Sequence, residues 1–92
     1  MDDEERINAL DRELTTLGPE THALKTKTLP DLIKQCRILR GEGHHQAADA
    51  LADRIEKLTE AIKSREQQLY AIERELYPLR AKQNRRKMKL RP

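Results

Sequence analysis

The second half of the chain carries one continuous helical pattern of apolar residues. From Ala48 to Leu79 these residues are spaced alternately three and four apart, and Arg65 alone interrupts them. A heptad repeat of this kind predicts a long helix with a narrow coiled-coil seam. Pro78 lies inside the repeat, so we expect the helix to kink or end there. Residues 80–92 are expected to form a basic helical extension or a disordered tail.

The first half of the chain predicts a second helical segment, which is interrupted. The same spacing relates four apolar residues, namely Ile7, Leu10, Leu14 and Leu17. Gly18-Pro19 should then break or kink the helix. A new helix is expected to start with Thr28 as its N-cap and Pro30 in its first turn. Its apolar face would consist of Leu32, Cys36 and Leu39, and it would end at Gly41-Glu42-Gly43.

A connector as short as Gly41-Glu42-Gly43 joins antiparallel helices. Residues whose numbers add up to about 84 should then face each other. This pairing places Cys36 against Ala48, and Leu10 between Ile72 and Leu76. We therefore expect an all-α fold, a long antiparallel helical hairpin that resembles a coiled coil and has breaks near 18–19 and 27–30.

The expected domain organisation follows from this pairing. The hairpin domain spans residues 1–79, with arm one at 1–40, the tip at 41–43 and arm two at 44–79, and residues 80–92 extend beyond it.

Composition narrows both the fold class and the range of functions. Charged residues make up 38% of the 92 residues and aromatic residues 2%, and Phe, Trp and Val do not occur. This composition excludes a β-sandwich and a typical enzyme pocket. A two-helix seam buries little apolar area, so we expect the hairpin to dimerise into a helical bundle or to join a hetero-oligomer. A broad apolar face inside one molecule is the alternative. The candidate interface residues are Ile33, Ile38, Tyr70 and Tyr77.

Charge is distributed unevenly along the chain. Residues 1–20 contain seven acidic and two basic residues, whereas residues 80–92 contain seven basic residues and no acidic one. The hairpin should bring the acidic residues 2–5 beside 79–82. The basic residues are Arg80, Lys82, Arg85, Arg86, Lys87, Lys89 and Arg91. They are candidates for contact with DNA or RNA phosphates, an acidic protein groove or a membrane surface, and a merely solvated tail is the alternative.

Other residue types that carry chemistry give weaker signals. His44 and His45 are adjacent and His22 is distant in the hairpin, so we expect no metal site. Cys36 is expected to be a small buried hydrophobic residue and not a nucleophile. Arg65 would form a polar layer that fixes the register of the seam. We expect no catalytic residues, no cofactor and no small-molecule substrate.

These observations favour a small non-enzymatic binding or adaptor protein. It would regulate or inhibit a larger protein or nucleoprotein machine through its helical surface and basic tail, as phage or plasmid accessory proteins of this size often do. One alternative is a DNA- or RNA-binding regulator acting as a helical dimer, and another is a chaperone or subunit of a secretion apparatus. No apolar run reaches the ~20 residues of a membrane span, and we expect a cytoplasmic location.

Overall fold

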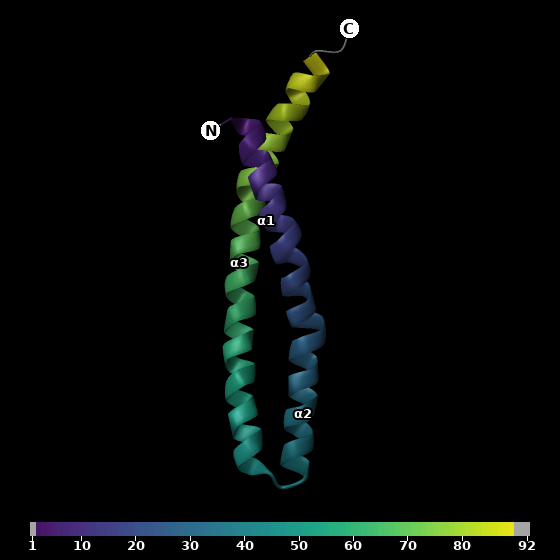
Figure 1. The fold of residues 1–92 in the computed structure, drawn as a ribbon, viewed down its shortest axis with the longest axis vertical. Helices are drawn as coiled ribbons and strands as arrows, with labels where there is room; N and C mark the ends of the chain where they lie inside the picture. Colours follow the sequence, from purple (N-terminus) through teal and green to yellow (C-terminus); the bar gives the residue numbers. More distant parts are fainter. Residues whose placement is uncertain (1, 90–92) are drawn as a thin grey trace.

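The computed structural model describes residues 2–89 of the chain, and their side chains through Arg86. Arm one consists of α1 (Asp3–Ala23), the short π-helix η1 (Leu24–Thr28) and α2 (Leu29–Gly41), and arm two is α3 (His45–Lys89). The two arms run antiparallel and form one long hairpin (Figure 1). The predicted all-α helical hairpin is confirmed.

The acidic first turn of α1 has a local structural role. The Asp2 side chain accepts a hydrogen bond from the Glu4 backbone N–H at 3.3 Å and thereby caps the helix. Asp3, Glu4 and Glu5 follow in the first turn, where negative charge is favoured by the helix dipole. Part of the acidic start of the chain therefore serves to begin α1.

The predicted break at Gly18-Pro19 is wrong, and the predicted helix start at Thr28 is a transition from η1 to α2 that lacks a side-chain cap. α1 runs through Gly18-Pro19 without interruption, and Thr28 has helical backbone angles and makes no capping hydrogen bond with its side chain. Pro19 is exposed, so its ring meets solvent, and the seam residues on either side of it, the half-buried Leu17 and the buried Thr21, stay covered. Packing of the seam outweighs the one backbone hydrogen bond that the proline removes.

Between α1 and α2, the π-helix η1 replaces the expected break. The seam of arm one passes from the half-buried Leu24 to the half-buried Leu29, a step of five residues in place of three or four. The Leu29 N–H donates to the Leu24 carbonyl, which is the hydrogen bond of a π-turn. The wider turn absorbs one extra residue, so the apolar face keeps its direction toward α3.

The tip closes with a glycine-dependent helix cap. Gly43 has a φ of 84°, a conformation that suits glycine. The Gly43 N–H donates to the Arg40 carbonyl at 3.1 Å and the His44 N–H donates to the Leu39 carbonyl at 2.9 Å. This pair of bonds is a Schellman motif, which ends α2 and turns the chain toward α3.

The buried core is divided into two clusters along the seam. The cluster near the open end contains Ile7, Leu10, Ile72 and Leu76, and the cluster near the tip contains Cys36, Ala48 and Leu51. Both predicted pairings, Cys36 with Ala48 and Leu10 with Ile72 and Leu76, are confirmed. Between the clusters lie the buried Thr21 of α1 and Ile62 of α3.

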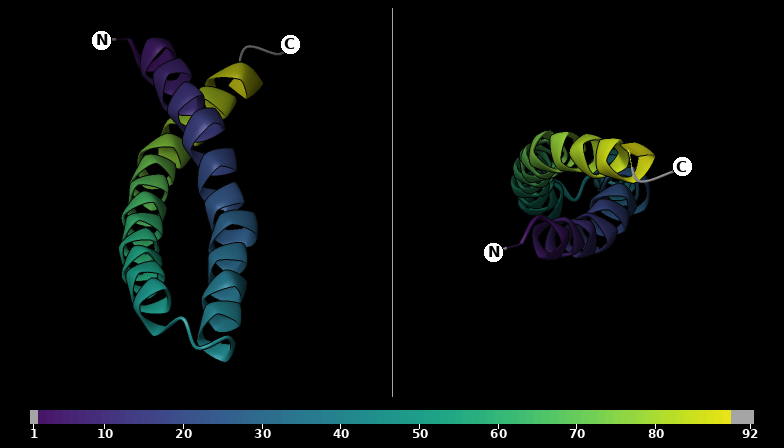
Figure 2. Two further views of the ribbon diagram at one scale, coloured as in Figure 1. Left: turned by 60° about the horizontal axis from the view of Figure 1, so that its bottom comes forward. Right: turned by 90° about the horizontal axis from the view of Figure 1, so that it is seen from above.

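α3 does not end at Pro78 but remains helical as far as Lys89. Its last turns lean away from the start of α1 (Figure 1), and the start of α1 crosses over the end of α3 (Figure 2, left). The basic segment is thus a helical extension over its described residues, and residues 90–92 lie outside the described part.

Candidate interaction surfaces

Three ion pairs connect α1 to α3 at the open end of the hairpin. The Arg6 guanidinium donates to both carboxylate oxygens of Glu75, at 2.6 and 2.7 Å. Arg80 donates to Asp11, and the Lys82 Nζ donates to the Asp3 carboxylate at 3.2 Å. The expected approach of the acidic start to residues 79–82 is confirmed by the Asp3–Lys82 pair.

The pair between Arg6 and Glu75 shifts the titration of both groups. The hydrogen bond from Arg6 lowers the pKa of Glu75 below its ordinary value, with a further contribution from the positive charge. The same hydrogen bond raises the pKa of Arg6. Both shifts favour the charged forms of the pair.

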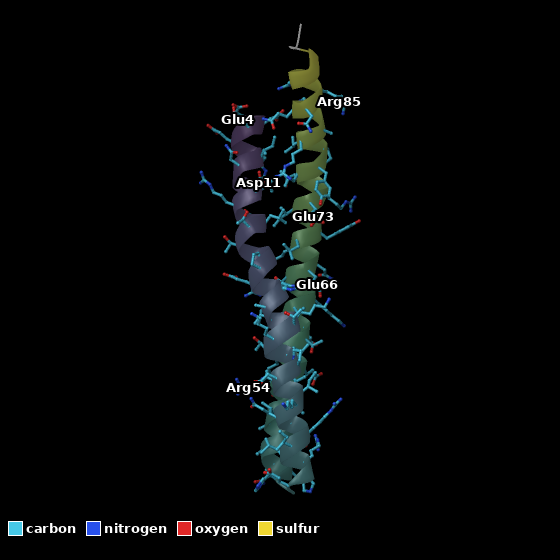
Figure 3. All side chains as sticks on the ribbon, turned by 90° about the vertical axis from the view of Figure 1, so that its right-hand side faces the viewer. Glu4, Asp11, Arg54, Glu66, Glu73 and Arg85 are labelled. Carbon is cyan, nitrogen blue, oxygen red and sulfur yellow. The ribbon has the colours of Figure 1, made fainter. Side chains whose placement is uncertain are left out.

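A basic face lies on α3 next to these pairs. Pro78, Lys82 and Arg85 are spaced four and three residues apart and share one side of the helix, and Arg86 adjoins them. Together the four residues line an open hollow of ≈ 450 Å³. Among the described side chains, Arg85 and Arg86 form no ion pair. Figure 3 shows Arg85 near the free end of α3. The side chains of Lys87, Lys89 and Arg91 lie outside the described residues.

The two tyrosines form a separate outer stripe on α3. Tyr70 is 62% exposed and Tyr77 57% exposed, and they lie seven residues apart on one side of the helix. Arg74, between them, places its guanidinium carbon 5.7 Å from the centre of the Tyr70 ring. This cation–π contact joins Arg74 to Tyr70. Sequence reasoning missed Arg74, although its spacing of four from Tyr70 marked it.

The tyrosine stripe and the basic face point in different directions. Tyr77 and Lys82 are five residues apart, which corresponds to about 140° around the helix. The tyrosines therefore do not lie over the hollow at Pro78 and are not placed to stack on bases of a nucleic acid bound there.

The candidate interface residues do not form one patch. Ile38, on α2 near the tip, is 49% exposed, and Ile33 is half-buried. These two residues are also five apart and point in different directions. The tyrosines belong to the opposite end of the hairpin.

Arg65 lies at a polar layer in the middle of the hairpin. Its Nη1 lies 3.3 Å from the Glu20 Oε2, and nearby the Lys25 Nζ lies 3.3 Å from the Glu66 Oε2. Glu66 is labelled in Figure 3. The sequence pattern identified Arg65 but missed Glu20, Lys25 and Glu66, because exposed charged residues are common on every helix. The role of Arg65 in fixing the register stays a prediction.

The remaining reactive side chains have ordinary surroundings. Cys36 is 8% exposed and its Sγ donates to the Ala48 carbonyl oxygen at 3.4 Å, which confirms a small buried residue. His22, His44 and His45 are exposed. Within the described residues, no three His, Cys, Asp or Glu side chains gather closely enough to hold a metal ion.

Comparisons with protein-family models, curated proteins and solved structures find no match for this chain. Function is therefore inferred from the residues of the chain alone. None of its described helices has the length and apolar character needed to cross a membrane.

Proposed function

We propose that this protein is a non-enzymatic helical adaptor that binds and regulates a larger protein or nucleoprotein machine. The tyrosine stripe carries the proposal. Tyr70, Arg74 and Tyr77 lie on the outer side of α3, away from the seam that holds the hairpin together. Tyr and Arg are enriched among the residues that dominate binding energy at protein interfaces. A rigid helix presents them without a folding cost on binding.

The surface area of the hairpin also supports a binding role. The single chain exposes 7300 Å², whereas a compact monomer of 10.8 kDa exposes about 5500 Å². The excess is larger than the area of about 800 Å² that a standard protein interface buries on each partner. An elongated hairpin of this kind has room for a partner along its whole length.

Affinity capture from a native lysate tests the adaptor role. A partner protein should be retained by the wild type after nuclease treatment and lost by the Tyr70→Ser/Tyr77→Ser variant. The matched control is Gln46→Ser/Gln68→Ser, which changes two exposed polar residues of the same helix. Adding the wild-type protein to the captured machine should then change the activity of that machine. Equal retention by the tyrosine variant and the control would contradict the proposed surface.

Self-association through the helices belongs to the same proposal. Sedimentation equilibrium of the pure protein should give about twice the 10.8 kDa of one chain if a second copy covers the hairpin. A single-chain mass would instead favour a hetero-oligomer with the partner.

A second candidate function is direct contact with DNA or RNA as a regulator. The basic face favours it, because Lys82, Arg85 and Arg86 are gathered on two turns of a helix with no acidic residue among 80–86. Clustered bases bind phosphates by releasing counterions. The chaperone and secretion-subunit alternatives rest on size and helicity alone.

A further inference from the structure

The basic face is partly covered by the acidic start of the same chain. Lys82 donates to Asp3 at 3.2 Å, and Arg80 donates to Asp11. Both acids lie on α1 and both bases lie on α3. The carboxylates thus occupy donors that a phosphate group would use, and one of these donors, Lys82, lines the hollow at Pro78.

Arg85 and Arg86 remain available beside these pairs. Both are exposed, and among the described side chains neither forms an ion pair. With Lys82 they line the open hollow at Pro78. A guanidinium presents a rigid fork of donors that matches the oxygens of a phosphate. The basic face therefore has two free donor groups, on Arg85 and Arg86, and one, on Lys82, that is held by a carboxylate, while Arg80 beside the face is held by a second carboxylate.

The surroundings of the basic face favour a nucleic acid over a lipid surface. Between 80 and 86 the only apolar residue is Ala81, so this part of α3 has no apolar side to insert into a bilayer. The end of α3 leans away from α1 as a single helix (Figure 1). A helix is about 10–12 Å across with its side chains, and the major groove of B-DNA is about 12 Å wide and admits it.

We propose that the basic face of Lys82, Arg85 and Arg86 binds the phosphates of duplex DNA, and that Asp3 and Asp11 compete with the DNA for Lys82 and Arg80. The inference rests on the second candidate function. It specifies duplex DNA as the partner and carboxylates of the same chain as groups that lower the affinity for DNA. Free DNA displaces the carboxylates, and the acidic start of α1 weakens binding to any site that offers few phosphates.

Fluorescence anisotropy with a 20-base-pair DNA duplex tests the contact. Arg85→Gln/Arg86→Gln in the full chain should weaken binding about tenfold at low salt and reduce the dependence of log K on log salt by about two. The matched control is Arg37→Gln/Arg54→Gln, which removes the same charge from two exposed arginines near the tip. Equal losses for both variants would overturn the assigned surface.

The competition is tested by Asp3→Asn/Asp11→Asn. This variant should bind the duplex several-fold more tightly than wild type, and the gain should shrink as salt rises. Glu56→Gln/Glu60→Gln raises the net charge equally at two exposed acids of α3 and should show a smaller gain. Circular dichroism verifies that each variant remains helical. Equal gains would overturn the competition, because a general change of charge would explain both.

Two further probes decide the class of partner. A double-stranded RNA of the same sequence should bind more weakly, because its major groove is too deep and narrow for a helix. Poly-glutamate of matched charge should also bind more weakly. Equal binding of the RNA or the peptide would overturn duplex DNA as the partner. If the DNA tests fail but the wild type still captures a protein through its tyrosines, the adaptor function remains supported.

Discussion

Arg65 of α3 pairs with Glu20 of α1 across the middle of the hairpin, with its Nη1 3.3 Å from the Glu20 Oε2. Glu20 directly follows Pro19, the proline inside α1. The polar seam position and the proline-containing turn therefore meet at one level, between the two apolar clusters. Two exposed ion pairs thus cross the middle of the hairpin beside the buried Thr21 and Ile62.

Arg65→Leu should stabilise the hairpin by about 1 kcal/mol. A seam leucine buries apolar area worth about 1.5–3 kcal/mol when fully covered, whereas an exposed ion pair contributes about 0–1 kcal/mol. Urea denaturation measures the difference, and Glu20→Gln, which removes the pair without adding apolar area, should lose less than about 1 kcal/mol. A large loss of stability in Arg65→Leu would show that the arginine is needed for the register.

Pro19→Ala should raise the free energy of unfolding by about 1–3 kcal/mol. Alanine restores an N–H donor inside α1 and removes the ring from the preceding turn. Thermal and urea unfolding followed by circular dichroism measure the gain. The control is Thr16→Ala, an exposed position of the same helix, which should change stability by less than about 0.5 kcal/mol. No gain at Pro19 would contradict a cost of the proline to the stability of α1.

Leu76→Ala should destabilise the hairpin by about 2–5 kcal/mol, because it leaves a cavity at a fully buried position. The two clusters are separate, so the loss should be concentrated at the open end. Hydrogen exchange should accelerate in α1 more than around Ala48. Leu69→Ala, at a half-buried position, should cost less. Uniform acceleration would show that the hairpin unfolds as one unit.

Glu75→Gln should destabilise the protein at neutral pH and not in acid. The pKa of Glu75 is lowered in the folded state by the hydrogen bond from Arg6. A lowered folded pKa contributes stability above the unfolded pKa, and this contribution is lost as the pH falls through the folded pKa. The melting temperatures of wild type and Glu75→Gln should therefore converge below the ordinary range of a glutamate. A constant difference across pH would contradict the role of the charge.

The sequence predicted the parts of the fold that depend on periodic apolar positions. The repeat from Ala48 to Leu79 predicted α3. The short connector predicted the antiparallel pairing that brings Cys36 to Ala48. It also indicated that the acidic and basic ends meet, as Asp3 and Lys82 do. These features follow from helix geometry and chain connectivity, which local spacing encodes directly.

Local rules failed where packing competes with backbone preference. Pro19 and Thr28 suggested helix ends, but the seam on either side of them packs against α3 and holds the helix together. The step of five residues from Leu24 to Leu29 is the one sequence feature that indicates the π-turn. It can be interpreted only when both residues are known to face the same seam.

The sequence by itself determined an all-helical hairpin, its register and the opposite charge of its two ends. The tertiary structure decided which charges remain free. In the fold, Lys82 and Arg80 pair with carboxylates of α1, whereas Arg85 and Arg86 are exposed. The tyrosines lie on another side of α3. The physical reason is that spacing along a chain fixes the face of a helix, whereas the partner of each charge depends on the groups that another helix brings within reach.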